Sequence, residues 1–347
     1  SASANITPRV LTVAYTGVDK VYDGLRVAAV TTTDNRVAGD VFDINRTAAF
    51  VDKNVSLSAG SVVSKVIDVS GISLSDPAGV TSIDAANYSI SATGTATASI
   101  TPKLLSAALV GSIQKTYDGN TTAALTNANF QVTGFVTVGG ASEGTSVTQT
   151  VGTYNSPRVV DANSVTASLA AGDFTANGGT SLSNYTLPTT ATGVGGINVR
   201  TLTVNFTGVN KVYDGFTVAT VTTTDNHVGS DVFNIVRSAD FDTKDIGSNK
   251  AISVYSVSLT GADASNYTVN STASTAANVT RLDSVTWVGG ASGEWFNPVN
   301  WAATGNLNVT GAIPDLNNVA HVVVPQGSAI SFDDSVAGRT GVARSGT

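Results

Sequence analysis

The sequence has 347 residues, of which 41% are hydrophobic and only 12% charged, and it carries a net charge of −7 with no cysteine. This length exceeds that of one ordinary β domain. The acidic balance, with no run of lysine or arginine, argues against nucleic acid as a partner. The missing cysteines exclude disulfides and thiolate metal sites, and no segment approaches the roughly 18 consecutive apolar residues that membrane insertion requires.

Three stretches of the chain open with a segment in which apolar and mostly small polar residues alternate. This alternation predicts a β-strand with one buried face. A glycine follows each segment (Gly17, Gly111 and Gly208) and is predicted to mark a turn. The apolar positions are Leu11, Val13 and Tyr15, then Leu105, Ala107 and Leu109, then Leu202, Val204 and Phe206.

Shortly after each strand the chain repeats almost the same five residues: KVYDG at 20–24, KTYDG at 115–119 and KVYDG at 211–215. Asp-Gly is typical of tight turns, and a tyrosine before it can bury its ring while its hydroxyl bonds a backbone group. A reaction centre copied three times is the less economical reading, and an isopeptide bond from the motif lysine to an asparagine is a sharper alternative. We therefore predict a structural corner at Tyr22, Asp23, Gly24, Tyr117, Asp118, Gly119, Tyr213, Asp214 and Gly215.

A second marker closes each stretch: Asn87-Tyr88-Ser89, Asn184-Tyr185-Thr186 and Asn266-Tyr267-Thr268. The strand that follows runs directly into the next repeat, so the connections are short and the domains are expected to form a stiff, elongated array. Strands of about 8–10 residues predict roughly 30 Å per domain. The fold class is all-β, with tandem Greek-key or immunoglobulin-like sandwich domains over 1–102, 103–199 and 200–282. β-grasp-like repeats with a short helix are the alternative.

The K-x-Y-D-G opening, the G-x-D-V-F segment and the closing Asn-Tyr strand resemble the YDG domains of large bacterial exoproteins. Those proteins are adhesins of the filamentous-haemagglutinin type, secreted by the two-partner route. The likeness covers about residues 5–281, and the middle repeat lacks the G-x-D-V-F segment. It implies a surface-displayed stalk of β domains and names no catalytic residue. The absence of methionine predicts a piece of a larger protein.

Residues 283–347 have a different character and are predicted to be a partial β module. Its tryptophans, Trp287, Trp295 and Trp301, are the only three in the chain. They could stack on the faces of sugar rings, or they could hold a small hydrophobic core together. The second interpretation is favoured, because tryptophan is usually largely buried.

The remaining polar residues give no sign of catalysis. His227 stands where the first repeat has Arg36, so it is predicted to be a solvated loop residue, and His321 to be an edge position. No zinc site, carboxylate pair or phosphate loop is indicated, so we expect neither an enzyme nor a cofactor. Asp-rich turns such as Asp34-Asn35, Asp225-Asn226 and Asp333-Asp334 could hold calcium with weak affinity, although no EF-hand or nonapeptide pattern is present.

Together these patterns predict a structural stalk or spacer in a secreted adhesin on the bacterial cell surface, which supports cell adhesion or biofilm formation. The expected partners are other adhesin domains in the same chain. The competing hypothesis is a carbohydrate-binding module for extracellular polysaccharide or host-cell glycans, with the three tryptophans as its site.

Overall fold

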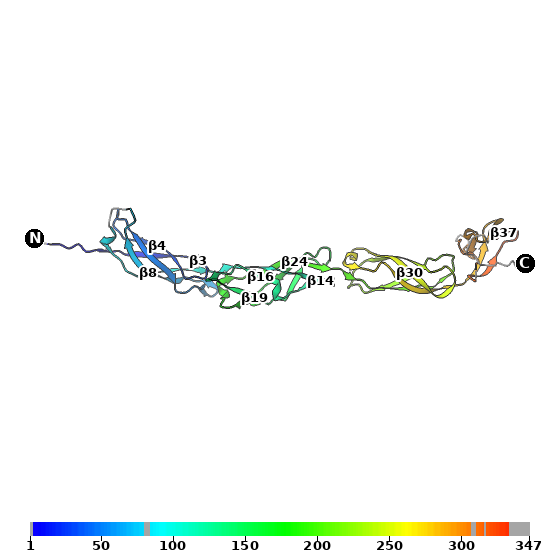
Figure 1. Ribbon diagram of the computed structural model, residues 1–347, viewed down its shortest axis with the longest axis horizontal. Helices are drawn as coiled ribbons and strands as arrows, with labels where there is room; N and C mark the ends of the chain where they lie inside the picture. The colour runs from blue at the N-terminus through cyan, green and yellow to red at the C-terminus, as the bar shows by residue number, and fades with distance from the viewer. Residues whose placement is uncertain (1–2, 80–83, 307–309, 316, 333–347) are drawn as a thin grey trace. The chain divides into compact units, whose positions relative to one another are not determined.

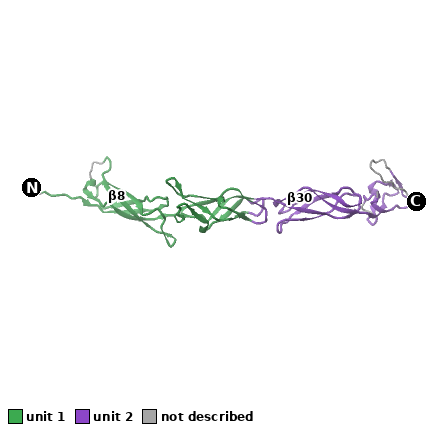
Figure 2. Cartoon of the chain, turned by 60° about the horizontal axis from the view of Figure 1, so that its bottom comes forward, with its two compact units in different colours: residues 1–114, 121–155, 163–196 green, residues 115–120, 156–162, 197–347 purple. Residues whose placement is uncertain are grey.

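The structure is a computed structural model that describes residues 3–79, 84–306, 310–315 and 317–332 (Figure 1). The chain divides into two compact units (Figure 2). Unit 1 holds residues 1–114, 121–155 and 163–196, and unit 2 holds residues 115–120, 156–162 and 197–347. The loops 115–120 and 156–162 of the second repeat thus belong to unit 2.

The protein is all-β, as predicted. In the part of the chain that the structure describes, helical conformation is limited to short 3-10 turns, none of them long and apolar enough to cross a membrane. The short helix of the β-grasp alternative is therefore not found there. The 3-10 turns are η1 (Asp84–Asn87), η2 (Asn127–Asn129), η3 (Ala171–Asp173), η4 (Leu182–Asn184), η5 (Ala264–Asn266) and η6 (Pro298–Asn300).

The first repeat, residues 9–101, is built from two antiparallel sheets, β5-β8-β10 and β2-β4, and two short parallel pairs, β1-β9 and β3-β11. Side chains of both sheets meet in one hydrophobic cluster that includes Ile67, Val69 and Val30. The strands are β1 (Arg9–Val10), β2 (Val13–Val18), β3 (Lys20–Val21), β4 (Ala29–Asp34), β5 (Asp43–Phe50), β6 (Leu57–Ser58), β7 (Ser61–Val62), β8 (Lys65–Ser75), β9 (Tyr88–Ser89), β10 (Gly94–Ala98) and β11 (Ile100–Thr101).

The third repeat, residues 200–280, has the same pairings: β29-β30-β32 and β26-β28 are antiparallel, and β25-β31 and β27-β32 are parallel. Even a β-bulge recurs, beside Arg46 in the first repeat and Arg237 in the third. The strands are β25 (Arg200–Thr201), β26 (Val204–Gly208), β27 (Lys211–Val212), β28 (Val221–Asp225), β29 (Asn234–Phe241), β30 (Gly247–Thr260), β31 (Tyr267–Thr268) and β32 (Ala273–Thr280).

The second repeat, residues 103–198, has diverged in its interior and joins most of its strands into one larger sheet, β15-β20-β21-β24-β13-β16. It keeps the parallel pair at its start, β12-β23. Its strands are β12 (Lys103–Leu104), β13 (Ser106–Leu109), β14 (Ile113–Thr116), β15 (Thr122–Ala124), β16 (Phe130–Thr133), β17 (Thr137–Val138), β18 (Ala141–Ser142), β19 (Gly144–Val147), β20 (Val151–Tyr154), β21 (Ser164–Ser168), β22 (Phe174–Asn177), β23 (Tyr185–Thr186) and β24 (Thr190–Asn198).

Two of the glycines predicted to mark turns lie inside strands instead. Gly17 is in β2, and a Cβ built on it would lie 2.5 Å from the carbonyl oxygen of Thr97 on β10. Gly208 is the last residue of β26, and its Cβ would lie 2.5 Å from the carbonyl oxygen of Ala276 on β32. Glycine is needed there because the backbones of the two sheets come close together, not because the chain turns.

The C-terminal module, residues 282–331, is a small β structure around buried tryptophans. Trp287 and Trp301 are 2% and 0% exposed and meet edge to face with ring centroids 5.1 Å apart. Their burial leaves neither ring face open to a sugar, and only Trp295 is partly exposed. The strands are β33 (Leu282–Trp287), β34 (Ser292–Glu294), β35 (Trp301–Ala303), β36 (Val319–Val323) and β37 (Ala329–Ser331).

Candidate functional site

The lysine and aspartate of each K-x-Y-D-G motif tie the turn together. Lys20 Nζ donates to Asp23 Oδ1 at 2.8 Å and to the carbonyl oxygens of Leu25 and Val27 at 2.8 and 2.9 Å. Burial alone would raise the pKa of Asp23, but the hydrogen bonds from Lys20 and the Leu25 N–H outweigh it and lower the pKa. Corresponding lysine–aspartate bonds are Lys115–Asp118 at 2.6 Å and Lys211–Asp214 at 2.8 Å.

The tyrosine of the motif points out of its own repeat and into the next one. In unit 1 the Tyr22 ring is 1% exposed, and its hydroxyl donates to Glu143 Oε1 of the second repeat at 2.7 Å. Tyr185, from the closing Asn-Tyr marker, donates to Glu143 Oε2 at 2.6 Å. The two rings meet edge to face at 5.4 Å, and Lys53 Nζ lies 3.4 Å from the same carboxylate. We call Tyr22, Glu143 and Tyr185 the first joint.

The second joint lies in unit 2 and has the same design. The Tyr117 hydroxyl donates to Asp231 Oδ2 at 2.9 Å, and Tyr267 donates to the same oxygen at 2.6 Å. The two rings again meet edge to face, with centroids 5.5 Å apart. Asp231 belongs to the G-x-D-V-F segment of the third repeat, so a carboxylate that follows the motif tyrosine along the chain again accepts from two tyrosines.

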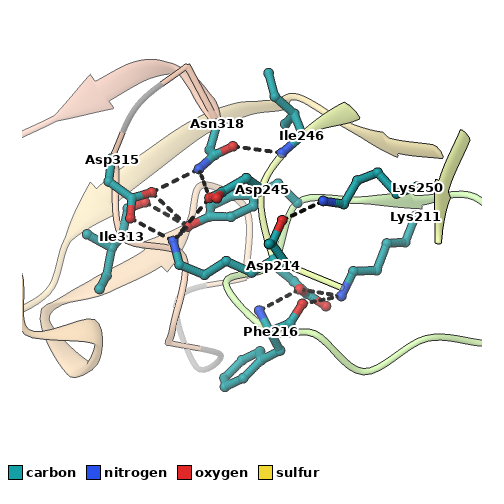
Figure 3. A network of polar contacts seen from close by, with 12 residues as sticks. Lys211, Asp214, Phe216, Asp245, Ile246, Lys250, Ile313, Asp315 and Asn318 are labelled. Carbon is teal, nitrogen blue, oxygen red and sulfur yellow. Dashed lines mark hydrogen bonds and ion pairs between the residues drawn. The ribbon is translucent and has the colours of Figure 1, made fainter. Parts of the chain in front are cut away.

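The third joint connects the third repeat to the C-terminal module, also within unit 2 (Figure 3). The Tyr213 hydroxyl lies 3.1 Å from Asp315 Oδ1 and 3.0 Å from the carbonyl oxygen of Ile313. Lys244 takes the place of the second tyrosine: its Nζ donates to Asp315 Oδ2 at 2.6 Å and to the Tyr213 hydroxyl at 3.1 Å. A module of different architecture therefore presents the same kind of acceptor.

Each joint also contains a buried asparagine that binds a backbone N–H of the preceding repeat. Asn184 Oδ1 accepts from the Val55 N–H at 2.8 Å, and this asparagine is 1% exposed. An asparagine side chain fits because its amide oxygen pairs an N–H that would otherwise be buried without a partner. The corresponding bonds are Val159 N–H to Asn266 Oδ1 at 3.0 Å and Ile246 N–H to Asn318 Oδ1 at 2.9 Å.

The glycine of the motif lets the next module approach. All three motif glycines have positive φ, between +78° and +84°, a conformation that favours glycine. A Cβ at any of them would collide with the following module. The ideal Cβ of Gly24 would lie 2.7 Å from Val138 Cγ2, that of Gly119 2.8 Å from Val228 Cγ1, and that of Gly215 2.0 Å from the Gly311 carbonyl oxygen.

The joints hold their tyrosines in the neutral form. The pKa of Tyr185 is raised to about 12, mainly by burial and secondly by the hydrogen bond to Glu143. The pKa of Tyr267 is also raised to about 12, mainly by burial and secondly by the hydrogen bond to Asp231. Burial also raises the pKa of Tyr213 to about 12. The ionised tyrosine would be both buried and next to a carboxylate, so the hydrogen bond requires the neutral hydroxyl.

At two of the three Asp-rich turns considered for weak calcium binding, the asparagine accepts a hydrogen bond from a backbone N–H 23 residues away. Asn35 Oδ1 accepts from the Thr12 N–H at 2.8 Å, and Asn226 Oδ1 accepts from the Thr203 N–H at 2.9 Å. Asp333-Asp334 lies outside the described residues. Over the ranges that the structure covers, no group of three histidine, aspartate or glutamate side chains could hold a metal ion.

His227 is an exposed loop residue, as predicted, and both it and Arg36 pair with a neighbouring carboxylate and ring. Arg36 Nη2 lies 2.7 Å from Asp34 Oδ2, and its guanidinium carbon lies 3.9 Å from the centroid of the Phe42 ring. His227 repeats the arrangement in the third repeat, where its Nδ1 lies 2.6 Å from Asp225 Oδ1 and its ring meets Phe233 edge to face. The two positions are therefore equivalent in structure and not merely in sequence.

The sequence did not reveal the carboxylates Glu143, Asp231 and Asp315 as joint residues. A signal existed for Asp231, because Asp231-Val232-Phe233 recurs in the first repeat as Asp40-Val41-Phe42. For Glu143 the signal was weak: it is one of only two glutamates, in the repeat that lacks that segment. The glutamate lies just after the β17–β18 hairpin, which lengthens the loop that holds the aspartate in the other repeats, and its N–H donates to the Val136 carbonyl as the Asp231 N–H does to Val228.

The YDG domain family matches the chain three times, at residues 7–97, 101–193 and 198–277. The chain belongs to this family of domains, and each matched stretch contains one K-x-Y-D-G motif. A search of curated proteins found no match to the sequence.

Proposed function

We propose that this chain is a spacer segment of a secreted bacterial surface adhesin, which holds a binding region away from the cell and so supports adhesion or biofilm formation. One observation carries the proposal: every recurring position of the repeated motif either closes its own turn or contacts the next module. Its lysine and aspartate close the turn, its tyrosine bonds the next module, and its glycine makes room for it. Such a motif serves connection, not catalysis.

The connections support a stiff spacer. In unit 1 a single residue, Pro102, separates β11, which pairs with β3 of the first repeat, from β12, which pairs with β23 of the second. In unit 2 a single residue, Arg281, separates β32 from β33. A linker of one residue between two paired strands has few conformations to adopt, and the joint contacts restrict it further.

Secretion to the cell surface rests on the absence of cysteine, the acidic and threonine-rich composition and the likeness to exported adhesins. The glycan-binding alternative has less support, because two of its three proposed residues are buried in the C-terminal module.

The experiment replaces residues 9–281 in the parent protein with either a Gly-Ser linker of equal residue count or a different array of three YDG domains. Adhesion of the producing bacterium is then measured under flow. If the segment is a spacer, the YDG array should restore adhesion and the flexible linker should not, because a Gly-Ser linker is a flexible coil that does not hold a fixed length. Equal adhesion with both replacements would contradict the proposal.

A further inference from the structure

The first repeat carries the acceptor half of a fourth joint at its N-terminal end. Tyr88, the counterpart of Tyr185 and Tyr267, donates its hydroxyl to Asp40, and the Val37 N–H donates to that hydroxyl at 2.9 Å. Val136 and Val228 make the same backbone bond to Tyr185 and Tyr267. Asp40 thus occupies the place of Glu143 and Asp231.

The donor half is not among the described residues. In the second joint Asp231 Oδ2 accepts from two tyrosines, whereas Asp40 accepts from Tyr88 alone within the described ranges. The Asn87 side chain is exposed and has no hydrogen-bond partner within those ranges, although its counterparts Asn184 and Asn266 are 1% and 0% exposed. A pocket of about 280 Å³ lies at this place, lined by Val37, Asp40, Asn87, Tyr88 and Pro8 among others.

The residues just before the first repeat indicate what fills the pocket. Ile6-Thr7-Pro8 has the same sequence as Ile100-Thr101-Pro102, the segment that ends the first repeat and leads into the second. Ile100 is 0% exposed in the core of the first repeat, where β11 pairs with β3 beside the motif. Ile6 is 99% exposed. Its sequence is that of a closing strand, and such a strand needs a YDG domain to pair with.

We infer that Asp40, Asn87 and Tyr88 form a socket for the Tyr-Asp-Gly corner of a further YDG domain, joined to this chain through Ile6-Thr7-Pro8. The motif tyrosine of that domain donates to Asp40, and one of its backbone N–H groups donates to Asn87. Ile6 then completes the core of that domain, as Ile100 does in the first repeat.

The test inserts a copy of residues 9–99 between Asn5 and Ile6 of the full chain, so that the copy ends in its natural Ile-Thr-Pro. Amide hydrogen exchange is measured at Val55 of the added copy, with Asn87 of the original first repeat intact or changed by Asn87→Ala. We expect exchange about tenfold slower with the asparagine, as one buried hydrogen bond of this kind gives. Equal exchange in both proteins would overturn the inference.

Two controls keep the outcome clear. The original Val55 amide, bonded to Asn184, should stay protected in both proteins, and the Ile67 and Val69 amides of the copy report whether it has folded. If that copy does not fold, a second version inserts residues 200–278 at the same point and reads the Ile246 amide. The experiment measures amide exchange and not adhesion, so a failure of this inference can be distinguished from a failure of the proposed function.

A second copy of this chain is the competing occupant. The motif tyrosines of the present chain are already bonded in their own joints, so the native protein should sediment as a monomer. A dimer that Asp40→Ala abolishes would overturn the inference in favour of self-association.

Discussion

The hydroxyl of Tyr22 lies 2.7 Å from the carboxylate of Glu143, a residue 121 positions further along the chain and in the next repeat. Tyr185 donates to the other oxygen of the same carboxylate. Glu143 is mostly buried, with 13% of its side chain exposed. A buried carboxylate of this kind is held by hydrogen bonds to both of its oxygens. Here each oxygen accepts from a tyrosine, and Lys53 Nζ adds a longer contact of 3.4 Å to Oε1.

Removing the carboxylate should destabilise unit 1. Glu143→Ala leaves two buried hydroxyl groups without an acceptor, at about 1–3 kcal/mol each, so we expect a loss of about 2–6 kcal/mol in the free energy of unfolding. Glu143→Gln should lose less, because its amide oxygen still accepts. Urea unfolding followed by circular dichroism measures both. Asp68→Ala, at an exposed position of β8, is the matched control and should change little. An alanine variant as stable as this control would count against the joint.

The motif glycines should be irreplaceable because of the next module as well as because of their backbone conformation. Gly60 has a φ of +80° with open space around its Cβ position, so Gly60→Ala measures the conformational cost alone, about 1–2 kcal/mol. Gly24→Ala should cost more, since Val138 must move. Gly215→Ala should cost most, because the atom in the way is a backbone oxygen.

The Gly215→Ala effect can be read directly, because all three tryptophans lie in the module that Gly215 contacts. Their fluorescence during urea unfolding should show a lower midpoint for that module. Equal destabilisation by Gly60→Ala and Gly215→Ala, each measured on its own unit, would mean that the third joint does not constrain the glycine.

The joints should weaken at high pH. Tyrosine titrates near 10 in an unfolded chain, whereas the pKa of Tyr185, Tyr213 and Tyr267 is about 12 in the folded protein. The folded state therefore holds these protons more tightly, and its extra stability is complete below pH 10 and is lost as the pH rises through about 12. Unfolding free energies at pH 9 to 12 should fall, less steeply in Glu143→Gln than in the native protein. Identical slopes would show that Glu143 does not contribute to the raised pKa of Tyr185.

The tryptophans should matter for the stability of their module and not for sugar binding. Trp301→Ala removes a fully buried ring and should cost about 3–5 kcal/mol. Trp295→Ala should cost less, because that ring is partly exposed. A glycan array probed with both variants is the check. Glycan binding that Trp295→Ala abolishes without a loss of stability would favour the carbohydrate-binding alternative.

The sequence alone was enough to predict the all-β class, because alternation at Leu11, Val13 and Tyr15 reports which face of a strand is buried. It could not predict that Tyr22 bonds the following repeat, since that contact depends on how two folded surfaces meet. The prediction for Gly17 was wrong for a related reason: the sequence does not show whether a glycine lies in a strand or in a turn. Only the close approach of Thr97 distinguishes them.

The middle repeat shows why part of the site was hidden. Asp40 and Asp231 share a recognisable segment, but the second repeat lacks it and uses Glu143, which follows a hairpin inserted into the equivalent loop. The longer side chain reaches the same position between two tyrosines. The chemistry of the joint is kept while the sequence that supplies it has changed, so a pattern search misses it.

The most direct test of the joint is a double-mutant cycle between Tyr22→Phe and Glu143→Ala in the full chain. If the hydroxyl and the carboxylate stabilise each other, the double variant should be more stable than the sum of the two single losses predicts, by about 1.5–3 kcal/mol. A coupling energy within about 0.5 kcal/mol of zero would show that the two residues act independently, and the motif tyrosine would then not join one repeat to the next.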